Sequence, residues 1–328
     1  MKMTSGETMN YIRIFLIGVV VITLGWNLAL GHAAEGEKDP EQFTFIQLSD
    51  IHWGFQDSLV NPDHARILEK VVAAINELRP APDFIVFTGD LTHATDDLQE
   101  RKRRMAEFRG FLDKLHQKNV QFLPGENDIG TDGGESYKEA FGGTYYSFEN
   151  KGVHFIVLDN VSDPAGLGKV QLKWLRDDLQ KVDPDAKIII FTHRPLFDLY
   201  PKWGWGTKDG AKALELLKPF KDVTVFYGHI HQENHTTIDS VVFHSAKSLM
   251  YPFPAPGSVP ENVPVLWDPE SPWKGLGYRG VMVKDGTPNC QLIPYLVPGA
   301  AEEPELVAKP VASTEPQADP KNVKVSKP

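Results

Sequence analysis

Cysteine is almost absent from this chain of 328 residues, which contains only Cys290. A lone cysteine excludes an internal disulfide, a thiolate zinc site and an iron–sulfur cluster held within one chain. Any metal ion bound by one chain must therefore be held by His, Asp, Glu or Asn side chains.

Basic residues are in the minority, with 34 Lys and Arg against 44 Asp and Glu and a formal net charge of -10. This charge repels nucleic acid and argues against a protein that coats a phosphate backbone. Small phosphorylated compounds stay compatible with it, because bound cations can reverse the local potential. The basic run Arg101-Lys102-Arg103-Arg104 lies in a stretch with helical spacing, and we expect it to be a solvated helix face.

Residues 1–33 have the order of a secretory signal peptide. Arg13 precedes an apolar run over residues 14–30, and the small residues Gly31, Ala33 and Ala34 follow it. We expect cleavage after Ala33 and a periplasmic or secreted protein that keeps no stable membrane span. The alternative is an uncleaved N-terminal anchor with the protein facing outward, because the run approaches the minimum of about 17 residues for a span.

Residues 300–328 form a tail that is rich in Ala, Pro, Glu, Lys and Val and has no aromatic residue. Such a composition cannot bury a core, so we expect this tail to be disordered. One folded domain over residues 34–299 remains. It is long enough to bury a well-packed centre.

Apolar periodicity predicts alternating strands and helices followed by a run of strands, which favours an α/β (α+β) fold of stacked sheets flanked by helices. Helices are expected at 61–79, 99–115, 170–181 and 209–217. Strands are expected at 43–49, 84–88, 120–123, 145–148, 153–158, 187–192, 223–227, 236–243, 280–283 and 291–295.

Five of these strands end in segments that carry His, Asp or Glu. They are Asp50-Ile51-His52, Gly89-Asp90, Gly125-Glu126-Asn127-Asp128, Thr192-His193-Arg194 and Gly228-His229-Ile230-His231. Each segment alone could be an ordinary turn. Ligands of α/β sheets gather outside the carboxyl ends of strands, so the five together predict one convergent metal site.

The five segments together resemble the signature of the calcineurin-like metallophosphoesterase family, over about residues 43–243. The resemblance implies a four-layer αββα sandwich and two transition-metal ions drawn from iron, manganese and zinc. It places Asp50, His52, Asp90 and His231 on one ion, and Asp90, His193 and His229 on the other, with Asp90 bridging. Such a pair can clamp a phosphate and activate a bridging hydroxide for attack on phosphorus.

The segment Gly125-Glu126-Asn127-Asp128 departs from the family, in which Gly-Asn-His followed by Asp or Glu is usual. An ungapped match makes Glu126 a ligand of the second ion and puts Asn127 where the family has the histidine thought to assist the leaving group. An amide cannot supply a proton at accessible pKa, so the usual acid is missing. A one-residue slip would instead make Asn127 the ligand. His93 could serve as the acid in its place, or could line the rim.

We therefore expect an exported dinuclear metal-dependent phosphoesterase that acts on a small phosphomonoester or phosphodiester. The alternatives are a pyrophosphatase of nucleotide- or lipid-linked diphosphates and a catalytically weakened relative that binds phosphorylated ligands. Two aromatic insertions, 201–205 and 251–278, could cover a substrate or pack on their own domain. Arg194, Lys247 and Arg279 are candidate phosphate contacts or salt-bridge partners. No pattern specifies an oligomeric state.

Overall fold

The computed structural model describes residues 42–284 and 290–300. Contacts divide the chain into the units Met1–Gly36 and Glu37–Pro328, and every described residue belongs to the second. The predicted signal peptide, the first residues of the predicted domain and the tail from residue 301 lie outside the described residues.

One sheet contains the first three strands of the described residues and the last two. Its strand order is β11-β10-β1-β2-β3. Strands β1, β2 and β3 run parallel, β10 pairs antiparallel with the free side of β1, and β11 pairs antiparallel with β10. The bounds are Gln42–Leu48 for β1, Phe84–Thr88 for β2, Val120–Leu123 for β3, Gly277–Lys284 for β10 and Gln291–Leu296 for β11.

The second sheet has the order β4-β5-β6-β7-β9-β8. Strands β5, β6, β7 and β9 are parallel, and β4 and β8 close the two edges as antiparallel strands. The bounds are Tyr146–Asn150 for β4, Val153–Val157 for β5, Lys187–Phe191 for β6, Asp222–Tyr227 for β7, His235–Ile238 for β8 and Val241–Ser245 for β9.

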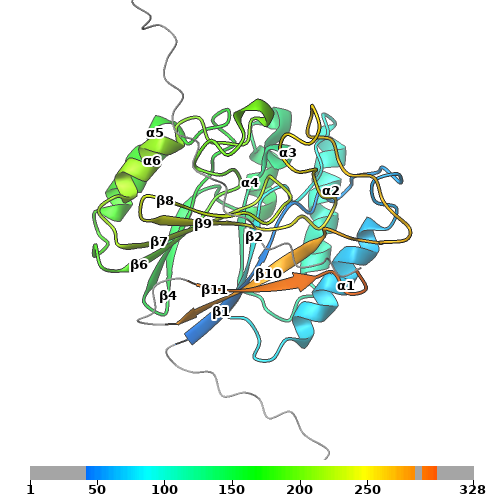
Figure 1. The fold of residues 1–328 in the computed structure, drawn as a ribbon, viewed down its shortest axis with the longest axis horizontal. Coiled ribbons are helices and arrows are strands. Elements are labelled where there is room, and N and C mark those ends of the chain that lie inside the picture. The colour runs from blue at the N-terminus through cyan, green and yellow to red at the C-terminus, as the bar shows by residue number, and fades with distance from the viewer. Residues whose placement is uncertain (1–41, 285–289, 301–328) are drawn as a thin grey trace, which may run out of the picture. The chain divides into compact units, whose positions relative to one another are not determined.

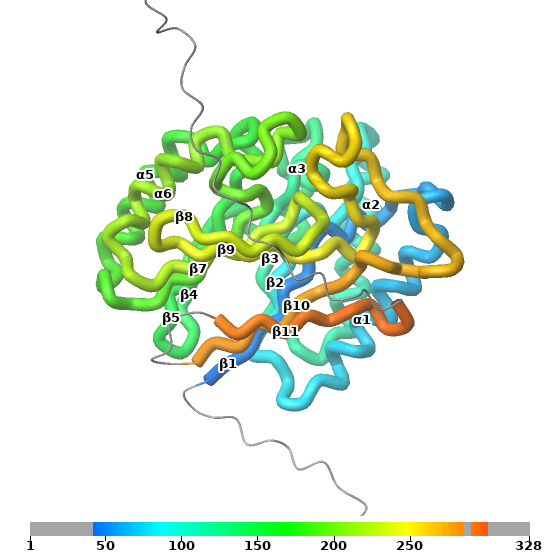
Figure 2. The backbone as a smooth tube through the Cα atoms, viewed as in Figure 1, coloured from blue at the N-terminus to red at the C-terminus, as the bar shows by residue number. Residues whose placement is uncertain are grey.

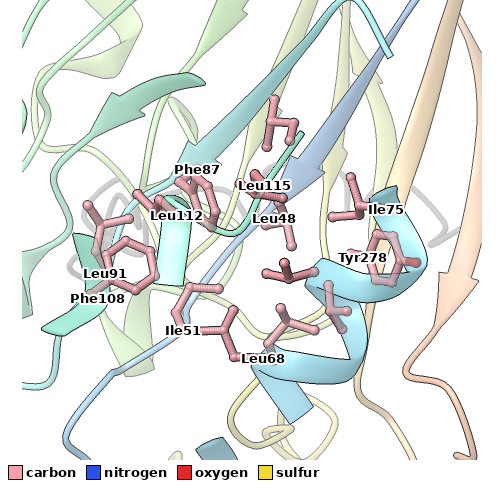
Figure 3. Close-up of a cluster of buried hydrophobic side chains, with 14 of the residues drawn as sticks. Leu48, Ile51, Leu68, Ile75, Phe87, Leu91, Phe108, Leu112, Leu115 and Tyr278 are labelled. Carbon is pink, nitrogen blue, oxygen red and sulfur yellow. The ribbon is translucent and has the colours of Figure 1, made fainter. Parts of the chain in front are cut away.

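Helices cover the outer face of each sheet, which gives the four layers (Figure 1). The helices α1 (His64–Glu77) and α2 (Leu98–Leu112) pack on the first sheet through buried side chains such as Leu68, Phe87 and Phe108 (Figure 3). The helices α5 (Gly168–Leu179) and α6 (Gly210–Leu217) pack on the second sheet through a separate apolar cluster. The predicted four-layer α/β fold is confirmed.

Aromatic rings fill the space between the two sheets. Phe45 on β1 stacks on Phe84 at a centroid distance of 4.9 Å and meets Phe226 of the other sheet edge-on at 5.4 Å. Rings packed in these geometries stabilise contacts beyond their area burial. They hold the sheets face to face, so that strand ends from both sheets open onto the same side of the molecule.

Three short elements were not expected from the sequence. They are α3 (Glu126–Ile129), the 3₁₀ turn η1 (Gly130–Asp132) and α4 (Glu135–Phe141). They follow β3 and are too short to show helical periodicity. A second 3₁₀ turn, η2 (Pro201–Trp203), lies in the first aromatic insertion.

The structure adds detail to two further expectations. The β-structure expected at 236–243 is a hairpin of β8 and β9, turned at Asp239, whose φ is 53°. The helix expected from Asn61 begins at His64.

The basic run on α2 is only partly a solvated face. Arg101 is 3% exposed, and its guanidinium donates to the carbonyls of Thr95 and Ile129 and to Asp132 Oδ1. Lys102 and Arg103 pair with surface glutamates, as a solvated face would. Buried Arg101 satisfies the carbonyl of Thr95 before α2 and that of Ile129 at the end of α3, and the charge pattern of the sequence does not reveal these contacts.

Within residues 42–284 and 290–300, no helix has the length and apolarity needed to cross a bilayer.

Candidate metal centre

The five strand-ending segments converge at the carboxyl ends of β1, β2, β3, β6 and β7, as expected. They bring together all seven residues predicted as ligands. Three sets of side chains have ligand atoms within 4.8 Å of one another: Asp50, His52 and His231; Glu126, His193 and His229; Asp50, Asp90 and His193.

The first group joins β1 to the segment after β7. His52 Nε2 lies 3.3 Å from His231 Nε2, and His231 Nε2 lies 3.4 Å from Asp50 Oδ1. All three side chains are at most 2% exposed. Two imidazole nitrogens and a carboxylate oxygen therefore point at one buried spot, which is a donor set suited to a transition-metal ion.

The second group joins α3 to the segments after β6 and β7. Glu126 Oε2 lies 3.0 Å from His193 Nε2, and Glu126 Oε1 lies 2.7 Å from His229 Nδ1. This group again offers two imidazoles and one carboxylate. Its glutamate is the most exposed of the three residues, so this side of the centre faces the opening.

Asp90 lies between the two groups. Its Oδ2 is 3.5 Å from His52 Nε2 and 3.6 Å from His193 Nε2, so one carboxylate oxygen faces a histidine of each group. Asp90 is 2% exposed. This is the position that a bridging carboxylate requires.

The backbone of the centre is held in an uncommon conformation. The residues Asp50, His52, Asp90, His229 and His231 all have positive φ, between 45° and 66°. Non-glycine residues adopt this region rarely, and clusters of such strain mark functional sites. Neighbouring glycines make room for them: a Cβ on Gly228 would lie 1.9 Å from Ser49 Oγ, and one on Gly125 would lie 2.1 Å from Asp90 Oδ1.

Backbone carbonyls orient two of the imidazoles. His193 Nδ1 donates to the Thr88 carbonyl at 2.8 Å, and His231 Nδ1 donates to the Tyr251 carbonyl at 2.6 Å. A proton on Nδ1 leaves the Nε2 lone pair free and aimed at the centre, as is usual for metal-binding histidines.

Two buried nitrogens at the centre, His193 Nε2 and His229 Nε2, make no hydrogen bond of proper geometry. Buried polar atoms are rarely left in this state, so the orphaned His193 Nε2 atom fits the position of a metal ligand. The donor set and the orientation of the rings also fit transition-metal ions.

The charges of the centre shift several pKa values in opposite directions. Burial raises the pKa of Asp90 well above its usual value, with Glu126, Asp128 and Asp50 adding to the rise. Burial opposes protonation of His193, but Asp90 and Glu126 raise its pKa to about 10. Burial would raise the pKa of Glu126, yet His229 and His193 hold it well below its usual value. Metal ions bind the deprotonated forms of these groups, so metal affinity at this cluster should depend on pH.

The structure favours Glu126 over Asn127 as the candidate ligand. Glu126 reaches both histidines of the second group, whereas Asn127 is turned toward Asp90. The Asn127 backbone N–H donates to Asp90 Oδ1 at 2.9 Å, and its side-chain amide donates to Asp90 Oδ2 at 2.7 Å. This arrangement matches the ungapped interpretation of the segment.

His93 lies behind His52. Its Nδ1 is 3.4 Å from His52 Nδ1, on the side of the His52 ring away from the nitrogen that faces the centre, and its ring packs edge-on against Phe55. Burial lowers the pKa of His93, and Arg104 lowers it further. A neutral His93 in this place is suited to positioning His52.

Sequence reasoning missed the residues that anchor the ligand loops. Asp128 is fully buried and accepts hydrogen bonds from the backbone N–H groups of Leu91, Thr92 and Gly125, which ties the Asp90 loop to α3. Ser248 Oγ likewise donates to the Asp50 carbonyl at 2.8 Å. The signal for Asp128 was its place three residues after Gly125 at a helix start.

The three candidate phosphate contacts differ in their distance from the metal centre and in their partners. Arg194 Nη1 lies 3.6 Å from Glu126 Oε1, beside the second group. Arg279 is 1% exposed and pairs with Glu233, so it is a salt-bridge partner inside the fold. Lys247 also has a partner.

The first aromatic insertion packs on its own domain. Trp205 is 1% exposed, and Trp203 packs edge-on against it and donates Nε1–H to the Pro260 carbonyl. From the second insertion, Tyr251 and Phe253 pack against His231 at centroid distances of 4.6 and 4.4 Å. They form an aromatic wall beside the first group.

Known proteins share this sequence pattern and fold. Serine/threonine-protein phosphatase CPPED1 from Mus musculus is 29% identical over 243 residues, which cover 64% of this chain and 78% of that protein. A protein named "Probable glycerophosphodiester phosphodiesterase GpdQ" from Arcobacter nitrofigilis is 26% identical over 62% of this chain and 77% of its own length. A dimetal phosphatase structure from Danio rerio, with 14% identity, superposes with a TM-score of 0.55 over 79% of this chain and 100% of that chain.

The family model for calcineurin-like phosphoesterases matches residues 43–233, which include every candidate ligand. These residues are more than half of the chain. The chain therefore belongs to the calcineurin-like phosphoesterase family and is a hydrolase of phosphoric esters.

Proposed function

We propose that the protein binds two transition-metal ions and uses them to hydrolyse a small phosphomonoester or phosphodiester. One ion would be held by Asp50, His52, Asp90 and His231, and the other by Asp90, Glu126, His193 and His229. The observation that carries this proposal is Asp90 Oδ2, which lies within 3.6 Å of a histidine nitrogen of each group. Iron, manganese and zinc all suit such nitrogen and carboxylate ligands.

The residues of the chain perform separate tasks in this site. Bound ions would supply the Lewis acidity that polarises a phosphoryl oxygen and acidifies water. The Thr88 and Tyr251 carbonyls fix the tautomers of His193 and His231, so that each presents a bare nitrogen. Asn127 orients the Asp90 carboxylate by two hydrogen bonds.

Arg194 places a positive charge beside the second group. Its Nε–H donates to the Gly206 carbonyl at 2.9 Å, and Nη2 donates to the Gly204 carbonyl, which fixes the guanidinium beside Glu126. We infer that Nη1 contacts a phosphate oxygen of the substrate, because a fixed guanidinium suits oxyanions.

The names of the relatives support either a phosphatase or a phosphodiesterase activity. A weakened relative that binds phosphorylated ligands is the second candidate, because the amide of Asn127 cannot protonate a leaving group. We further propose that the protein is exported, on the pattern of residues 1–33.

Turnover by protein loaded with manganese, iron or zinc tests the proposal. The substrates are p-nitrophenyl phosphate, bis-p-nitrophenyl phosphate and a phosphoserine peptide, and we expect turnover of at least one of them. Asp90→Asn should abolish turnover and release at least one ion, since an amide bridges two cations poorly. The matched control Asp177→Asn changes an exposed carboxylate on α5 and should retain both properties.

Elemental analysis gives the number of ions per chain. A value that stays at or below one after reconstitution would contradict the dinuclear centre. Two bound ions without turnover of any substrate would favour the ligand-binding candidate.

A further inference from the structure

A cavity of about 340 Å³ lies between the segment before α1 and the second aromatic insertion. Figure 2 shows the gold chain after β9 running beside the blue chain that leads into α1. The apolar lining comes mainly from Val60, Met250, Pro252, Leu266, Trp267 and Trp273. The volume falls within the range of about 300 to 1,000 Å³ that is typical of small-molecule sites.

The cavity is distinct from the metal centre. Met250 and Pro252 line it, whereas the alternate residues Tyr251 and Phe253 pack against His231. Successive side chains of an extended segment point to opposite sides. The cavity and the metal centre therefore lie on opposite faces of the segment 250–253, and no candidate metal ligand lines the cavity.

Hydrogen bonds hold the walls of the cavity in place. Trp267 N–H donates to the Leu59 carbonyl at 2.8 Å, and Val265 N–H donates to the Pro252 carbonyl at 3.0 Å. Asn61, which is 3% exposed, donates from Nδ2 to the Met250 carbonyl at 2.7 Å. A cavity whose walls are joined in this way is preformed, and a ligand would bind without the cost of ordering it.

The side chains around the cavity specify the chemistry of an occupant. Leu266 and Trp267 are 66% and 36% exposed, although both are strongly apolar. Covering them with an apolar group would be favourable, and the indoles of Trp267 and Trp273 can pack on a ring or a chain.

Asp268, Ser271 and Lys274 add polar side chains to the lining. Lys274 is exposed and forms no ion pair with any residue in the described part of the chain, whereas Asp268 Oδ1 accepts a hydrogen bond from Glu270 N–H. An ammonium group in this state can bind an anionic group at the edge of an apolar ligand.

We propose that this cavity is a second ligand site, which binds a small molecule made of an apolar ring or chain and one anionic group. The site is separate from the metal centre. The ligand places its apolar part between Trp267, Trp273 and Met250, and its anionic group at Lys274.

Titration with 8-anilinonaphthalene-1-sulfonate, followed by its fluorescence, tests this proposal on the full chain. We expect saturable binding of one molecule per chain and displacement by octanoate. Leu266→Glu should weaken binding roughly tenfold or more, because it puts a charge into the apolar lining. Val170→Glu is the matched control, since Val170 is a 77% exposed apolar residue on α5, outside the lining, and should leave binding unchanged.

Two further measurements distinguish binding in this cavity from binding at the metal centre or on exposed apolar surface. Lys274→Gln should weaken displacement by octanoate but leave displacement by 1-octanol unchanged. Removal of metal with a chelator should not affect binding of the probe. Absence of saturable binding, equal effects of Leu266→Glu and Val170→Glu, or loss of probe binding on removal of metal would each overturn the proposal.

Discussion

The side-chain amide of Asn127 donates a hydrogen bond of 2.7 Å to Asp90 Oδ2, the oxygen that faces both histidine groups. The residue that replaces the histidine usual in this family therefore orients the central carboxylate of the site. An amide performs this task at every pH, but it has no proton to give to a leaving group.

Asn127→His should restore an acid beside the leaving oxygen. We expect turnover of alkyl phosphoesters, whose leaving groups need a proton, to rise by about 10²-fold, a typical contribution of general acid catalysis. Nitrophenyl esters should gain much less, because p-nitrophenolate leaves without a proton. Parallel kinetics on the two substrates measure the contrast. An equal fall for both, with loss of metal, would show instead that Asn127 is a ligand.

Glu126→Gln should remove the ion of the second group. The neutral amide lacks the charge that pairs with His193 and His229, so metal affinity should fall by more than about tenfold. Metal titration by calorimetry measures this change. Asn127→Ala is the comparison and should keep both ions. Loss of an ion in Asn127→Ala, with both ions kept in Glu126→Gln, would support the slipped interpretation of the segment.

Gly125→Ala should disrupt the centre by steric overlap alone. The new Cβ would lie 2.1 Å from Asp90 Oδ1 and 2.3 Å from Asp90 N, which forces the carboxylate to move. We expect loss of activity and weaker metal binding. The control is Gly110→Ala on α2, where a Cβ meets nothing within 4 Å and should stabilise the helix by about 0.5–1 kcal/mol. Full activity in Gly125→Ala would show that the loop tolerates the shift.

Removal of metal should lower the melting temperature. Ions that bind only the folded centre stabilise it by about 2.7 kcal/mol when their free concentration is a hundred times the dissociation constant. Calorimetric melts before and after chelation, and after manganese is restored, measure the effect. Asp90→Asn should show a smaller difference. An unchanged melting temperature of the native protein after chelation would argue against bound ions.

His244 should make stability depend on acid pH, away from the metal centre. Burial lowers the pKa of His244 to about 3, with His235 and Arg279 adding to the effect. Its contribution to the free energy of unfolding is therefore complete above the unfolded pKa of about 6.5 and is lost as pH falls toward 3. His244→Phe keeps a ring against Phe226 and should flatten this dependence. Denaturant melts from pH 7 to pH 4 measure it, and an unchanged slope would contradict the assignment.

The sequence by itself determined the fold class and the identity of the candidate ligands. Short apolar runs such as 84–88 end abruptly at Asp90, and an abrupt change from buried strand to acidic loop is a local property that a sequence records. Asp50 and Asp90 follow neighbouring parallel strands of one sheet, so their convergence also followed from the order of the elements. His193 follows β6 of the other sheet, and only the packing of the two sheets brings it to them.

Only the tertiary structure decided which side chains meet. Glu126 and Asn127 are adjacent in sequence and lie in the first turn of α3. The Glu126 side chain reaches His193, whereas the Asn127 side chain reaches Asp90. The buried role of Asp128 depends on backbone N–H groups 36 and 37 residues away along the chain, and that of Arg101 depends on a carbonyl 28 residues away. Charge patterning along one segment cannot report such contacts, because the partners come from other loops and burial is a property of the assembled layers.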